Sequence, residues 1–130
     1  MKKHQINPWQ WQDVFGFSQA WKIDAPGSVV FVSGQASISA DGNVMHAHDF
    51  EAQAQLTFQN LKTVLEAAGA SLSDVVKLGA FVTNMSNLDT YGAVQAEFFP
   101  GLKPAQTLVQ VASLALPEMM IEVEAMAVVE

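Results

Sequence analysis

Residues 104–129 read PAQTLVQVASLALPEMMIEVEAMAVV and predict two consecutive strands, 107–114 and 120–129, joined around Pro117. Both runs are rich in apolar and β-branched residues, the types that suit a half-buried pleated surface. In the second run apolar side chains alternate with others, so one face of that strand suits packing under helices. The inward positions are Ile121, Val123, Ala125, Ala127 and Val129.

Upstream of this stretch the pattern alternates between strands and helices. Residues 17–23, 29–33 and 75–83 predict strands, the first two joined by the turn sequence Asp24-Ala25-Pro26-Gly27. A helix is expected over 49–68, with Asp49 as its cap and Gly69 as its left-handed stop, and a second helix over 88–99. The buried face of the first helix would comprise Ala54, Thr57, Phe58, Leu61, Leu65 and Ala68.

The resulting order β-β-α-β-α-β-β predicts an α+β fold, one mixed sheet with both helices on one face. The opposite face of the last strand would carry Met120, Glu122, Glu124, Met126 and Val128. The neighbouring strand adds apolar residues to both faces, with Val76, Leu78, Ala80 and Val82 on one and Val75, Lys77 and Phe81 on the other. The face without helices is too apolar to meet water throughout, which favours burial against other subunits. The alternative is scattered exposed hydrophobics, which are common on any protein.

Composition narrows the class of protein. The chain has 130 residues, which predicts a single domain with residues 1–14 as an N-terminal arm. A formal net charge of −7 argues against nucleic-acid binding, which needs a basic surface. The sequence has no cysteine and no apolar run of the ~20 residues that span a bilayer. We therefore expect no membrane partner and take the cytoplasm as the default location.

Four segments in order resemble the RidA (YjgF, L-PSP) family, and the resemblance extends from Phe15 to Ala127. VFVSGQ ends a strand as the family's S-G-Q motif does, and the last segment resembles the P-A-R-[ST] signature followed by an [IV]-E-[IV]-E-A strand. The segments are FGFSQA (15–20), VFVSGQ (30–35), NLKTVLEAAGASLSDVVK (60–77) and the C-terminal stretch quoted above.

This resemblance implies a chorismate-mutase-like homotrimer whose sheets form a central barrel, with no cofactor and no metal. It also implies deamination of an enamine or imine in a pocket between two subunits. Glu122 would be the catalytic carboxylate that positions a water and relays protons. The substrate-binding positions would be Phe17, Ser33, Gly34, Tyr91, Gly92, Gln106 and Thr107.

Three of these positions depart from the family pattern. The signature arginine, which grips the substrate carboxylate, is Gln106 here, and the chain contains no arginine at all. Phe17 lacks the hydroxyl of the tyrosine that the family often has at this position. Gly92 falls near the position where relatives can carry a polar helix residue that faces the ligand. The resemblance thus favours a small reactive metabolite as ligand, while ordinary 2-imino-acid deamination is not expected. The alternatives are a binding or sensing protein without chemistry and, less favoured because of the charge, a ribonuclease or translation inhibitor.

Two other groups of residues invite a functional interpretation. His46 and His48 with Asp49 and Glu51 are metal-ligand types, but they run into a helix start where the acids suit the helix dipole. An aromatic group near the N-terminus suits either a planar ligand or the attachment of the arm to the body, and we favour attachment. This group comprises Trp9, Trp11, Phe15, Phe17 and Trp21.

Overall fold

The structure is a computed structural model that describes residues 2–8, 10–25 and 27–130, without the side chains of Gln12 and Phe15. Trp9, Pro26 and the Phe15 side chain, which enter the sequence predictions above, lie outside the described residues. The strands are β1 (Lys2–Ile6), β2 (Ala20–Asp24), β3 (Ser28–Ala36), β4 (Val75–Val82), β5 (Ala105–Gln110) and β6 (Ile121–Val129). The helices are α1 (Phe50–Ala67) and α2 (Leu88–Phe98).

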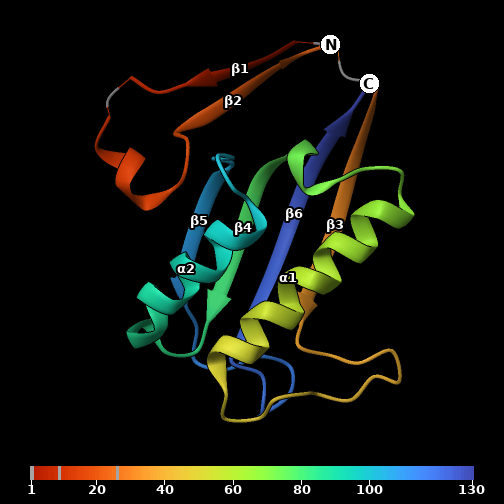
Figure 1. Cartoon of the computed structure of the whole chain (residues 1–130), viewed down its shortest axis with the longest axis vertical. Coiled ribbons are helices and arrows are strands. Elements are labelled where there is room, and N and C mark those ends of the chain that lie inside the picture. Colours follow the sequence, from red (N-terminus) through yellow and green to blue (C-terminus); the bar gives the residue numbers. More distant parts are fainter. Residues whose placement is uncertain (1, 9, 26) are drawn as a thin grey trace.

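The main sheet has the order β3-β6-β4-β5, and both helices lie on one of its faces (Figure 1). β6 runs antiparallel to β3 and β4, whereas β4 and β5 are parallel. The predicted α+β architecture with a mixed sheet is confirmed. The fifth strand is shorter than predicted: β5 begins at Ala105 and ends at Gln110.

α1 forms where its caps and its apolar face predicted it. The Asp49 side chain accepts a hydrogen bond from the Ala52 backbone N–H at 3.1 Å, and Gly69 adopts φ 77° beyond the last turn. Phe58, Leu61 and Leu65 are completely buried. Ala68, predicted on the buried face, is instead exposed because it caps the helix after the chain has left the core.

Phe58 connects the two helices and thereby positions Tyr91 and Gly92, the predicted site residues of α2. Its ring lies 5.9 Å from that of Tyr91, 5.5 Å from that of Phe98 and 5.8 Å from that of Phe99, between ring centroids. Tyr91 is almost fully buried as a result. Replacing such a ring by alanine typically costs about 3–5 kcal/mol of stability, so this contact holds α2 firmly against α1.

The start of β4 corrects one detail of the predicted pattern. A register shift lies between Val75 and Lys77 where β4 pairs with β6, and Val75 belongs to the core cluster with Leu78. Val76, predicted to share the face of Leu78, is buried but is not part of that cluster. A bulge of this kind places two consecutive residues opposite one and so breaks strict alternation.

The N-terminal hairpin is the part of the fold that the sequence did not predict. β1 pairs with β2 as a separate antiparallel ribbon beyond the end of the main sheet (Figure 1). The predicted strand 29–33 forms in full within β3, and the predicted strand 17–23 forms in part as β2. The two do not pair with each other, since β3 pairs with β6. The described helices include none long and apolar enough to cross a bilayer.

Candidate functional site

A cavity of about 660 Å³ lies within one chain, between the segment that follows β1, the helix α2 and the start of β5. Four of the predicted ligand positions line it, although they come from widely separated parts of the sequence. They are Phe17, Tyr91, Gly92 and Gln106. Its other walls are mainly apolar and include Val14, Leu88, Phe99, Leu102 and Leu108.

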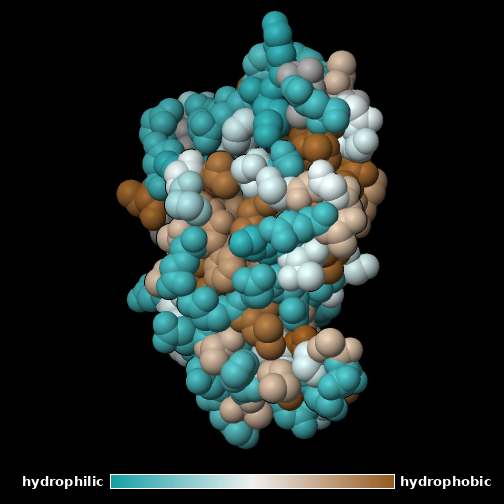
Figure 2. Space-filling view, turned by 45° about the vertical axis from the view of Figure 1, so that its right-hand side comes forward, coloured by the Kyte–Doolittle hydropathy of each residue, from teal (hydrophilic) through white to brown (hydrophobic). Residues whose placement is uncertain are grey.

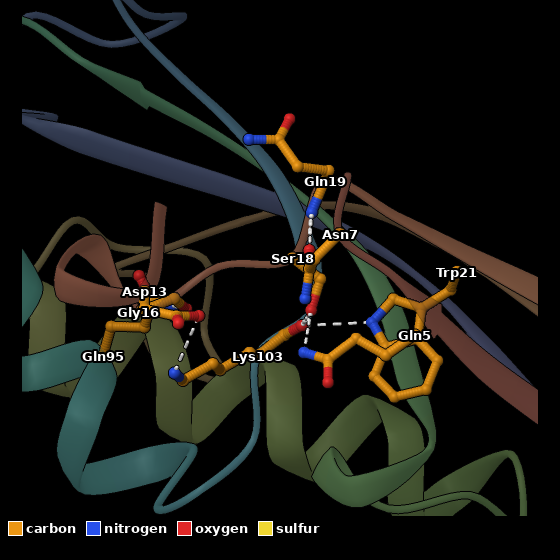
Figure 3. Close-up of polar contacts among 9 residues, drawn as sticks. All are labelled: Gln5, Asn7, Asp13, Gly16, Ser18, Gln19, Trp21, Gln95 and Lys103. Atoms are coloured by element: carbon orange, nitrogen blue, oxygen red, sulfur yellow. Dashed lines mark hydrogen bonds and ion pairs between the residues drawn. The ribbon is translucent and has the colours of Figure 1, made fainter. Parts of the chain in front are cut away.

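The N-terminal segment forms its wall because hydrogen bonds attach it to the loop before β5 (Figure 3). The Trp21 indole donates to the carbonyl oxygen of Lys103 at 3.0 Å, and the Ser18 hydroxyl donates to the same oxygen. The Ser18 N–H donates to the Pro104 carbonyl at 3.1 Å, which makes residues 18 and 105 a parallel bridge partner pair. The expected role of Trp21 in attaching the arm is thus seen directly.

Inside the hairpin, polar side chains hold this segment in shape. Gln5 donates to the Ser18 hydroxyl at 2.6 Å, and Asn7 accepts from the Gln19 backbone N–H at 2.8 Å (Figure 3). From the opposite wall, the buried Gln95 of α2 reaches the Gly16 carbonyl at 3.5 Å. Trp11 packs edge-on against Phe17, with ring centroids 5.8 Å apart. The cavity is therefore closed on this side by an ordered wall.

The charged groups of the cavity are two aspartates and one lysine. Lys103 and Asp13 form an ion pair with Nζ and Oδ1 3.4 Å apart, which links the loop to the N-terminal segment. Asp89 lies at the start of α2 and also lines the cavity. Among the described residues of the lining, Lys103 is the one cation, and it already has a carboxylate partner.

Tyr91 and Gln106 form the polar centre of the cavity wall. The Tyr91 hydroxyl donates to Oε1 of Gln106 at 2.5 Å. Burial raises the pKa of Tyr91 far above its ordinary value of 10, so that the hydroxyl stays protonated. With Oε1 occupied by this donor, no described residue accepts a hydrogen bond from the amide nitrogen of Gln106, which remains available to a ligand.

The remaining predicted positions lie on the other face of the sheet. Glu122 projects there from β6, and its carboxylate packs on Gly34 so closely that a Cβ at residue 34 would collide with it. Gly79 makes similar room for Glu124, whose Oε1 would lie 2.9 Å from an added Cβ. The glycine of the S-G-Q motif thus has a steric purpose, since it gives the carboxylate its place against β3.

Ser33 and Thr107 belong to this second face as well. Ser33 lines a groove of about 310 Å³ together with Lys77, Gly79 and Glu124. The Lys77 ammonium donates to the Thr107 hydroxyl at 3.2 Å. Thr107 follows Gln106 in the same strand, and successive strand residues point to opposite faces, which separates these two predicted neighbours by the sheet itself.

The helix-free face also exposes large apolar side chains. The exposed fraction of Phe31 is 74%, and Val29 and Val109 are exposed at 43% and 38%. Figure 2 views a different side of the molecule, that of α1 and β3, where separate hydrophobic patches lie in a mainly hydrophilic surface. The exposed fractions of Phe31, Val29 and Val109 thus agree with the predicted excess of apolar residues on the helix-free face.

Some residues of the cavity were not among the predicted positions. Asp13, Gln95 and Phe99 line it, yet their sequence contexts are those of an arm, a helix core and a helix end. The one sequence feature that links Lys103 to the predicted site is its position three residues before Gln106. His46 and His48 lie in the loop before α1 with φ values of 58° and 66°, not on a shared strand face. The described residues contain no group of three metal-ligand side chains.

A protein family and individual proteins are similar to this chain over most of its length. The family model described as Endoribonuclease L-PSP matches residues 12–129. A 2-iminobutanoate/2-iminopropanoate deaminase of Dermatophagoides farinae is 35% identical over 119 residues, which cover 92% of this chain and 90% of that protein. These matches extend over both the cavity and the helix-free face.

Solved structures agree with the sequence comparison. The Rid-family protein YyfB of Yersinia pestis superimposes with a TM-score of 0.89 at 36% identity, over 99% of this chain and all of that one. RidA from the Antarctic bacterium Psychrobacter superimposes with a TM-score of 0.73 at 34% identity, over 87% of this chain and 88% of that one. The chain belongs to the Rid family, also described as the endoribonuclease L-PSP or YjgF family.

Proposed function

We propose that this protein is a homotrimer with small-molecule pockets between its subunits, which acts on a reactive enamine or imine. Its substrate differs from the 2-iminobutanoate and 2-iminopropanoate that the name of the Dermatophagoides farinae relative specifies. The observation that carries the proposal is the division of the eight predicted site residues into two groups on opposite faces of one sheet. In a trimer built through the helix-free face, the two groups of neighbouring copies would come together.

The second group supplies the reactive carboxylate. An imine carbon is already electrophilic, so the protein must position a water and transfer protons, which one carboxylate can do. Glu122 is half-buried and held in a slot that Gly34 leaves open. A carboxylate in this setting has a defined orientation without a lysine partner among the described residues, which suits a proton-relay role.

The first group argues against a carboxylate as the principal recognition element. Gln106 occupies the signature position of the arginine, and no copy of this chain contains an arginine to replace it. A charge-assisted hydrogen bond contributes about 1.5–3 kcal/mol, more than a neutral one. Because a carboxamide cannot supply a permanently charged bidentate fork, we expect weak turnover of 2-iminobutanoate.

The test combines substrate choice with two matched variants. The pure protein is incubated with freshly generated 2-iminobutanoate and with imines that lack a carboxylate, and ammonia release is followed. We expect background rates with the first substrate, turnover with an imine of the second type, and a loss of about a hundredfold or more in Glu122→Gln. Glu124→Gln, two residues along the same strand face, is the control and should retain activity.

Two results would contradict the proposal. Family-like turnover of 2-iminobutanoate by the unchanged protein would show that Gln106 does not prevent that reaction. Equal activity of Glu122→Gln and the wild type on every substrate would remove the catalytic role of that carboxylate.

The second candidate function is a binding or sensing protein without chemistry. The replacement of the signature arginine by Gln106 favours it, because a site that lost its substrate clamp can still bind small molecules. It predicts thermal stabilisation by a ligand while Glu122→Gln changes neither binding nor product formation. The ribonuclease alternative remains the least favoured, given the net charge of −7.

A further inference from the structure

We infer that the cavity beside α2 selects a neutral ligand with a carbonyl or carboxamide oxygen, and that the amide nitrogen of Gln106 is the donor that recognises this oxygen. The inference deepens the proposed function, on which it rests for the assignment of this cavity as the ligand site. It concerns the chemical class of the ligand and is independent of whether any reaction follows.

The orientation of the Gln106 carboxamide carries the first step. Its Oε1 accepts the hydrogen bond of the Tyr91 hydroxyl at 2.5 Å, so its NH₂ group points to a different partner. No described residue accepts from that NH₂ group, and Gln106 lines the cavity. A half-buried amide donor without a protein acceptor is best satisfied by an acceptor on a ligand.

Tyr91 makes this orientation permanent and acts as a positioning residue. It is 2% exposed, packed against Phe58, and the only tyrosine of the chain. A phenol that stays protonated can donate to Oε1 at any physiological pH, but it cannot provide a negative charge. The hydroxyl of the buried Tyr91 therefore fixes the direction in which the Gln106 amide group points.

The charges of the lining exclude the acid form of such a ligand. Asp13 and Asp89 face the cavity together with Lys103, so the described lining carries two negative charges and one positive charge. The ammonium of Lys103 is engaged by Asp13 at 3.4 Å. A ligand carboxylate would lose its hydration, meet a net negative surface and find its one cation already paired. A neutral amide avoids all three costs.

The shape of the cavity sets the rest of the ligand. Apolar groups dominate its walls, with the Phe17 ring on the arm side and Leu108 on the sheet side. A compact aromatic or branched carbon skeleton bearing one carboxamide, ester or ketone group fits this surface. Among reactive imines and enamines, those that carry an amide or ester group in place of a free carboxylate belong to this class. Free 2-imino acids do not.

The test uses two probes of nearly equal shape, benzamide and benzoate, and binding to the folded wild-type protein is measured by calorimetry or by ligand-observed nuclear magnetic resonance. We expect benzamide to bind at least about fivefold more tightly than benzoate, the range of one neutral hydrogen bond. In Gln106→Glu the donor is lost, so benzamide binding should fall about fivefold. Gln59→Glu, which adds the same charge on the exposed side of α1, is the control and should retain wild-type binding.

The variant Tyr91→Phe tests whether the Tyr91 hydroxyl positions the Gln106 amide or whether the ring only packs in the core. Without the hydroxyl, the Gln106 amide can turn, and we expect the preference for benzamide over benzoate to shrink to about twofold or less. Should this core variant fold poorly, the Gln106→Glu result decides the inference alone. A retained preference in folded Tyr91→Phe would overturn the positioning role.

Other outcomes contradict the inference outright. Benzoate binding equal to or tighter than benzamide binding, and abolished by Lys103→Met, would show that the cavity recognises acids through Lys103. Absence of binding by both probes would overturn it as well. The proposed function fails separately: a clear amide preference without any imine turnover would leave the ligand class in place and remove the chemistry.

Discussion

On the helix-bearing side of its sheet, one chain supplies a whole cavity of about 660 Å³, lined by Gln106 and closed by the N-terminal segment. On the opposite side it supplies Glu122 in the slot beside Gly34, a shallow groove, and an uncovered Phe31. The first region is complete by itself, and the second has the character of half an interface. We propose that recognition and chemistry are divided between these two faces and that a second copy brings them together.

The largest expected effect concerns the uncovered face. Phe31→Lys places an ammonium where we expect subunits to meet, and we predict that the trimer dissociates to monomers, because an unpaired charge in an interface is costly. Light scattering after size-exclusion chromatography measures the mass. Val64→Lys changes an exposed apolar residue of α1 in the same way and should leave the mass unchanged. A Phe31→Lys protein that remains trimeric would show that the face is not the interface.

The second prediction concerns a variant that adds a cation to the cavity on the helix-bearing side of the sheet. Gln106→Arg should bind small carboxylates such as 2-oxobutanoate about ten- to a hundredfold more tightly than the wild type, the equivalent of about 1.5–3 kcal/mol. Calorimetry on the folded variant measures this gain. Gln110→Arg, at the end of the same strand but outside the cavity lining, is the matched control and should show no gain. If both variants behave alike, the cavity is not where carboxylates bind.

A third, smaller effect tests the wall of the cavity. Trp21→Phe removes the indole N–H that donates to the Lys103 carbonyl, and we expect a loss of about 1 kcal/mol in arm attachment. Amide hydrogen exchange should accelerate in the hairpin β1–β2 while the protection of β6 is unchanged. Equal acceleration in both places would mean that the arm and the sheet unfold as one unit.

The smallest effect concerns whether water reaches Tyr91 on the helix-bearing side of the sheet. Because Tyr91 is the one tyrosine, its ionisation can be followed by absorbance near 295 nm. Its folded pKa lies above its ordinary value, so at pH 10.5 the folded protein should show no phenolate, whereas the denatured chain is ionised to about three quarters. The unfolded state alone releases this proton, so Tyr91 lowers the free energy of unfolding by about 0.8 kcal/mol at that pH. Phenolate absorbance in the folded protein would reveal water around Tyr91.

The sequence predicted the main sheet and its helices because their signals are local. The Asp49 cap, the Gly69 stop and the alternation around Glu122 each act over a few residues. The strand β1 gave no such signal, since all five residues of KKHQI are exposed and none is selected by burial. Its pairing with β2 depends on a ribbon that stands apart from the core.

The sequence named candidate site residues but did not predict how they are arranged. Gln106 and Thr107 were grouped by sequence, but strand geometry places them on opposite faces. Asp13 reaches Lys103 across 90 positions of the chain, a contact that no local pattern encodes. The family resemblance named positions, while the division of those positions between a finished cavity and an open face came from the fold.

The attachment of the arm at residue 103 has a consequence for how this protein can evolve. Ser18 and Trp21 hold the carbonyl oxygen of that residue, which every amino acid possesses, while its side chain adds an ion pair with Asp13. A change of Lys103 to a neutral side chain therefore loses that ion pair but keeps both hydrogen bonds to the backbone that attach the arm. The loop before β5 is thus a place where new specificities can arise by single substitutions while the architecture around them is inherited intact.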